Sequence, residues 1–153
     1  MSLLALPVVA ALLAGCGQGS AAQRTPQLAK LPLVAGSRIS LQVLRCDKGA
    51  NGFCAWELVI TGSGYRSSEA LLRSEHRRLL KLGWSGANGD VGNEHAADSP
   101  GHKLRLTYAT AVGDLQGIDL GWIHRSHQVE LALSRAIFSH APTMSMLLEL
   151  GAS

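Results

Sequence analysis

The chain contains 153 residues, of which 46% are hydrophobic and 16% are charged, and its net charge is +3. So small a positive balance is far from the strongly basic composition of nucleic-acid-binding proteins, and no nucleic-acid partner is expected. Three cysteines are present, one near the N-terminus at position 16 and two close together at positions 46 and 54.

The first fifteen residues carry no charge and include an apolar run of about ten residues, the length of the hydrophobic region of a signal peptide. This run is shorter than the roughly twenty residues that span a bilayer. It ends in Leu13-Ala14-Gly15-Cys16, which resembles the bacterial lipobox, where cleavage precedes a cysteine that carries diacylglycerol. The missing Lys or Arg near Met1 departs from that pattern.

The sequence therefore predicts a signal peptide over residues 1–15, lipidation of Cys16 and a location on the extracytoplasmic face of the cell membrane. The alternative is a buried apolar helix with a free thiol. Residues 16–36 begin with a Gly-, Ser- and Ala-rich stretch without a hydrophobic period, so they are predicted to form a flexible tether. Residues 37–151, about 115 in number, are enough for a single α+β domain with its own core.

Cys46 and Cys54 are predicted to form a disulfide bond, because an exported chain meets an oxidising compartment. Asn51-Gly52 lies between them and favours a two-residue turn, which would place Cys46 opposite Glu57 instead. We therefore expect a wider loop between two strands. Two reduced cysteines are the alternative, whereas a metal site lacks a second cysteine pair.

Two strands and a helix are predicted first in the domain. Hydrophobic residues alternate with other residues over 39–43 and 55–60, which is the period of β-strands, and these strands form the disulfide-linked hairpin. Residues 68–82 have the pattern of an amphipathic helix, with Ser68 as its N-cap and Gly83 just beyond its C-terminus.

A long loop over residues 84–101 is predicted next, because this segment is rich in Gly, Asn and Asp. Residues 103–108 alternate as a third strand and residues 118–123 indicate a short fourth strand. Ser126 is the expected N-cap of a second helix, and residues 143–150 alternate as a final strand.

From the second hairpin strand onward, this order is the split β-α-β order of ferredoxin-like proteins. The predicted fold is thus α+β, a two-layer sandwich with a mixed sheet and an extra N-terminal strand in the disulfide-linked hairpin. Right-handed crossovers are expected to place both helices on one sheet face. If residues 118–123 form a loop, a related mixed sheet with the same two layers is expected.

Several side chains in and after the long loop are of the kinds that bind Ca²⁺ or Zn²⁺. Their spacing matches neither an EF-hand nor an HExxH pair, so a solvated loop is the favoured interpretation and no cofactor is expected. These five metal candidates are Asp90, Glu94, His95, Asp98 and His102.

His124 and His127 flank Arg125 where the second helix begins, a position that suits metal binding or proton transfer at mildly acidic pH. Ordinary polar residues at a helix start are the simpler interpretation. Residues 62–67 lack the last glycine of a G-x-G-x-x-G loop, and Ser63 and Ser85 lie in no G-x-S-x-G elbow, so no nucleotide site or hydrolase triad is predicted.

Three blocks, Gly83-Trp84, residues 97–110 and residues 132–135, resemble small lipoproteins of high-GC Gram-positive bacteria. That resemblance brings no known activity and no catalytic residues. The expected function is a non-enzymatic module, anchored in the membrane by lipid, that binds an envelope protein, a cell-wall ligand or lipid headgroups. The alternative is a metal-binding protein or hydrolytic enzyme that uses the 90–102 loop with His124 or His127.

Overall fold

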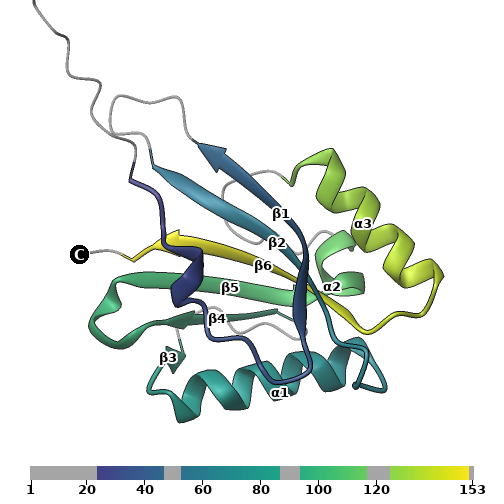
Figure 1. Cartoon of the computed structure of the whole chain (residues 1–153), viewed down its shortest axis with the longest axis horizontal. Coiled ribbons are helices and arrows are strands. Elements are labelled where there is room, and N and C mark those ends of the chain that lie inside the picture. The colour runs from purple at the N-terminus through teal and green to yellow at the C-terminus, as the bar shows by residue number, and fades with distance from the viewer. Residues whose placement is uncertain (1–23, 47–52, 87–93, 117–124, 152–153) are drawn as a thin grey trace, which may run out of the picture.

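The computed structural model describes residues 24–46, 53–86, 94–116 and 125–151. Within them the chain forms a six-stranded antiparallel sheet in the order β1-β2-β6-β5-β4-β3, with helices packed against it (Figure 1). The predicted α+β class is confirmed. The strands are β1 (Arg38–Cys46), β2 (Cys54–Thr61), β3 (Ser85–Gly86), β4 (Glu94–Asp98), β5 (Leu104–Thr110) and β6 (Thr143–Leu150). The helices are α1 (Ser68–Lys81), α2 (Ala111–Leu115) and α3 (His127–Phe138), with 3-10 helices η1 (Leu28–Lys30) and η2 (Pro100–His102).

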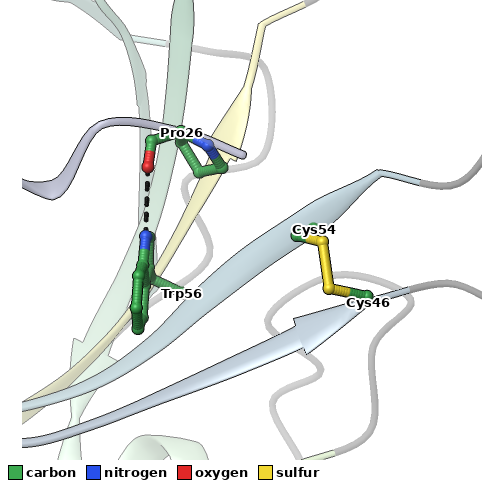
Figure 2. The surroundings of a disulfide bond; sticks show 4 residues. All are labelled: Pro26, Cys46, Cys54 and Trp56. Atoms are coloured by element: carbon green, nitrogen blue, oxygen red, sulfur yellow. Dashed lines mark hydrogen bonds between the residues drawn. A yellow bond between two sulfur atoms is a disulfide. The ribbon is translucent and has the colours of Figure 1, made fainter. Parts of the chain in front are cut away.

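The predicted disulfide-linked hairpin is confirmed. Strands β1 and β2 pair so that Cys46 lies directly opposite Cys54, and the two sulfur atoms are bonded (Figure 2). This register excludes the pairing of Cys46 with Glu57 that a two-residue turn would impose. A bulge between Ile39 and Leu41 turns the start of β1, so Ile39 packs with the core on one sheet face and Leu41 with the core on the other.

Both faces of the sheet are covered, which corrects the expectation that the two long helices share one face. Leu58 and Met146 pack with the leucines of α1, whereas Val59, their neighbour on the opposite face, packs with Val129 and Leu133 of α3. Figure 1 shows α1 on one side of the sheet and α2 and α3 on the other. The ferredoxin-like arrangement is not confirmed.

Strand β6 shows why its alternating pattern did not reveal that helices cover both faces of the sheet. Its polar residues Thr143, Ser145 and Glu149 are buried, because β6 lies between β2 and β5 and α2 and α3 cover that face. An alternating pattern indicates one polar, solvated face only where no helix covers it.

Helix α1 begins one residue earlier than expected, since Ser67 is its N-cap and accepts a hydrogen bond from the Ala70 N–H. The predicted cap, Ser68, instead accepts a hydrogen bond from the Thr143 N–H of β6. At the other end Gly83 has a φ of 78°, as a residue beyond a helix C-terminus often does. The Trp84 N–H then bonds to the Leu79 carbonyl, which turns the Trp84 side chain into the core.

The expected long loop over residues 84–101 is wrong in part, because its described ends form β3 and β4, which pair with each other. Strand β4 reads EHAAD and lacks the hydrophobic alternation by which strands are recognised, yet it pairs along β5. Helix α2 was not expected. The predicted strand over residues 118–123 lies outside the described residues.

Residues 24–36, here called the N-terminal arm, are the described part of the predicted tether over residues 16–36, and they are docked on the domain. They lie along the sheet face that α1 also covers (Figure 1). Four hydrophobic arm residues pack against the core. Burial of their side chains stabilises the docked arm, although the Gly/Ser/Ala-rich stretch that precedes them suggested a free tether. The four residues are Leu28, Leu31, Leu33 and Val34.

None of the described helices is both long and apolar enough to cross a membrane.

Replacing Cys46 and Cys54 together by alanine is expected to lower the free energy of unfolding by about 2.5 kcal/mol, because the disulfide no longer closes residues 46–54 into a ring that restricts the unfolded chain. Urea unfolding measures this loss. Reduction of the unaltered protein should reproduce it, while Leu44→Ala at an exposed site of β1 should have little effect. Equal unfolding midpoints for the cysteine variant and the oxidised protein would contradict the prediction.

Candidate functional site

The start of the N-terminal arm is bound to the disulfide-linked end of the hairpin. The Arg24 carbonyl accepts a hydrogen bond from the Cys54 N–H at 3.0 Å, and Arg24 forms a parallel bridge with Phe53. The Pro26 carbonyl accepts a hydrogen bond from the Trp56 indole N–H, also at 3.0 Å (Figure 2). The arm therefore attaches at the point where the disulfide joins β1 to β2.

The other end of the arm is bound to α1 and to the turn that precedes it. The Val34 N–H donates to Glu75 Oε2 at 2.7 Å, and the Tyr65 hydroxyl donates to the Ala35 carbonyl at 2.7 Å. Glu75 is fully buried. Burial raises the pKa of Glu75 to about 7, while the Val34 N–H and the positive charge of Arg78 act in the opposite direction.

Between these two attachments the arm forms one wall of a pocket of about 370 Å³, here called the arm pocket. Thr25, Gln27 and Lys30 line it from the arm. Ser99 and Lys103 line it from the turn between β4 and β5. The volume lies in the lower part of the range of small-molecule binding sites.

The rest of the lining is apolar. Trp84 and Leu104, each 6% exposed, belong to the core packed under α1, and Leu150 and Pro100 complete the surface. The turn that carries Pro100 is held by paired hydrogen bonds between Ser99 and Leu104. The pocket thus combines an apolar surface on fixed elements with two lysine side chains.

The metal candidates of the sequence do not converge among the described residues. Successive strand residues point to opposite faces, so His95 of β4 lies on the α1 face whereas Glu94 and Asp98 lie on the other. Asp98 is 3.9 Å from His102 and 3.8 Å from Arg105. No group of three or more His, Cys, Asp or Glu in the described ranges is placed to hold a metal ion. Asp90 lies outside those ranges.

His95 instead contacts two residues that the sequence did not connect with it. Its ring centre lies 4.5 Å from that of His76 on α1 and 5.6 Å from that of Tyr108 on β5. The buried Tyr108 hydroxyl lies 2.7 Å from Nδ1 of His76. This cluster joins α1 to β4 and β5 by ring packing and a hydrogen bond.

The candidate histidine pair at the start of the second helix is not tested by the described residues, which include His127 but not His124. His127 is in the first turn of α3 with its side chain 87% exposed, 3.8 Å from Glu130, and His124 lies outside the described residues. The buried polar groups nearby are different ones. Asp114 of α2 pairs with Arg125 at 3.2 Å, and burial raises the Asp114 pKa although Arg125 opposes that shift.

Glu57 of β2 accepts a hydrogen bond from the Ser126 N–H at the start of α3. A carboxylate is favourable at a helix N-terminus, where the backbone N–H groups have no partners within the helix. Together with the Asp114–Arg125 pair, this contact fixes α2 and α3 on their sheet face, so we assign these buried charges a structural role.

Comparison of the chain with protein-family models, with curated proteins and with solved structures finds no match. The function is therefore inferred from the arm pocket and the chemistry of its residues.

Little in the sequence indicated this pocket. Its lining residues come from four separate segments, and their meeting depends on the docking of the arm. The available signals were local ones: Gly83 beside Trp84 at the end of a helix, and the Ser99-Pro100-Gly101 turn.

Substitution of Glu75 by glutamine is expected to remove a pH dependence of stability. Unfolded Glu75 ionises near pH 4.5, whereas the folded residue stays protonated to about pH 7, so the unaltered protein loses stability as the pH rises between these values. Glu75→Gln keeps an oxygen acceptor for the Val34 N–H and should be more stable at pH 8 by on the order of 2 kcal/mol.

Urea unfolding between pH 5 and 8 measures this difference, and Glu130→Gln, half-exposed on α3, is the matched control. An equally steep loss of stability with rising pH in the Glu75 variant would show that the buried carboxyl is not its source.

Proposed function

We propose that this chain is a lipid-anchored protein of the extracytoplasmic membrane face that binds a small ligand in the arm pocket. The observation that carries the proposal is that the residues forming one wall of the pocket follow the lipobox-like segment closely in the chain. The arm that follows Cys16 supplies the pocket wall itself, through Thr25, Gln27 and Lys30.

Two further features support this proposal. The Cys46–Cys54 disulfide fits an oxidising compartment outside the cytoplasm. Eight peptide units separate Cys16 from Arg24, where the docked arm begins, and a fully extended chain of that length reaches about 29 Å at most. An acylated Cys16 would hold the arm pocket close to the membrane surface.

A binding function agrees better with the pocket than an enzymatic one does. The pocket lining joins apolar side chains to lysines, and its described residues include no carboxylate, histidine or cysteine. Binding sites commonly have this composition, with a few polar groups that orient a ligand on an apolar surface.

The anchor is tested by the intact mass of the protein made in a high-GC Gram-positive host. We expect the mature chain to begin at Cys16 with an added diacylglycerol and to sediment with membranes, because at about 0.8 kcal/mol per buried CH₂ two acyl chains give durable attachment. Cys16→Ser should abolish both the added mass and the sedimentation.

The control is the Cys46→Ala/Cys54→Ala variant, which retains Cys16 and should retain the acyl mass. Recovery of the unaltered protein with residues 1–15 attached and no acyl mass would reject the proposed anchor.

A further inference from the structure

We propose that the arm pocket binds a single-chain amphiphile with an anionic headgroup, a carboxylate or a phosphate, taken from the membrane that anchors the protein. This inference rests on the proposed function and specifies its ligand. It is based on the lining of the pocket, its size and its place on the chain.

The charge of the lining selects the headgroup. Lys30 on the arm and Lys103 on the turn are the two charged residues among those that line the pocket, and both are positive. They line the pocket from separate elements, and both are exposed, so the charge of the lining favours an anionic group over a neutral or cationic one. Ser99 and Thr25 add hydroxyl groups to the same lining.

The apolar lining selects the rest of the ligand. Trp84, Leu104 and Leu150 present aromatic and aliphatic surface that is continuous with the core beneath α1. A polar metabolite would leave this surface without a partner, whereas an alkyl chain removes it from water at about 25 cal/mol per Å².

The volume of the arm pocket limits the length of the ligand's alkyl chain. A volume of about 370 Å³ lies in the lower part of the range of small-molecule binding sites. Such a pocket fits a headgroup with one short alkyl chain, or part of a longer chain, better than a whole two-chain lipid.

The test is photo-crosslinking of the full lipidated protein in phosphatidylcholine nanodiscs. Four photoreactive probes share one short alkyl chain and differ in their ends: a carboxylate, a monophosphate, an alcohol and a trimethylammonium group. Peptide mass spectrometry locates the adducts. The intact mass of the same sample shows whether Cys16 is acylated, so failure of the anchor and failure of the ligand assignment are distinguished.

We expect the anionic probes to label peptides that contain Trp84, Leu104 or Leu150 about tenfold more than the alcohol or the ammonium probe, as charge-assisted hydrogen bonds imply. Preference for the carboxylate would identify a fatty acid as the ligand class, and preference for the phosphate a lysophospholipid-like headgroup. Lys30→Ser/Lys103→Ser should remove the preference, and Lys30→Arg/Lys103→Arg should retain it.

Lys81→Ser, at an exposed site of α1 outside the pocket, is the matched control and should leave the labelling unchanged. Equal labelling by all four probes, adducts outside the pocket, no adducts on an acylated protein, or labelling that survives loss of both lysines would each overturn the inference.

Discussion

The arm pocket depends on the docking of the N-terminal arm. Hydrogen bonds at its two ends and hydrophobic packing hold the arm, together with an isolated bridge between Arg24 and Phe53. Backbone carbonyls of Arg24 and Pro26 bind the disulfide-linked end of the hairpin, and the Val34 N–H binds the buried carboxyl of Glu75. Because the partners of both attachments belong to other elements, the position of the arm is set by tertiary contacts. These contacts enclose the arm pocket and connect it to the segment that leads from Cys16.

Placing the disulfide at this end of the hairpin has a clear physical effect. Strand β1 is an edge strand, and the pairing of Cys46 with Cys54 holds its end against β2. Cys54 also donates its N–H to the arm. One covalent bond thereby stabilises both the hairpin and the wall of the pocket.

Local features of the fold were largely predictable. The hairpin, α1, α3 and strands β5 and β6 agree with the hydrophobic period, whereas the capping details differ: Ser67 caps α1, and the Ser126 side chain makes no capping hydrogen bond to α3. Features that arise between distant segments were not predictable. The Glu94–Asp98 strand has no hydrophobic alternation, and the polar residues of β6 gave no sign that a helix covers them. The Gly-, Ser- and Ala-rich stretch before the arm suggested a tether that continued into it. The pocket was missed because its lining also comes from distant segments. Lys30 joins Trp84 and Lys103 only when the arm docks.

The most direct test of the docked arm is backbone hydrogen exchange of the unaltered protein and of Trp56→Phe, which removes the indole donor to Pro26. We predict slow exchange at Lys30, Leu31 and Val34 in the unaltered protein, and several-fold faster exchange at these amides in the variant, with β2 and β6 unchanged. Exchange of the arm at the rate of an unstructured chain in the unaltered protein would contradict the account.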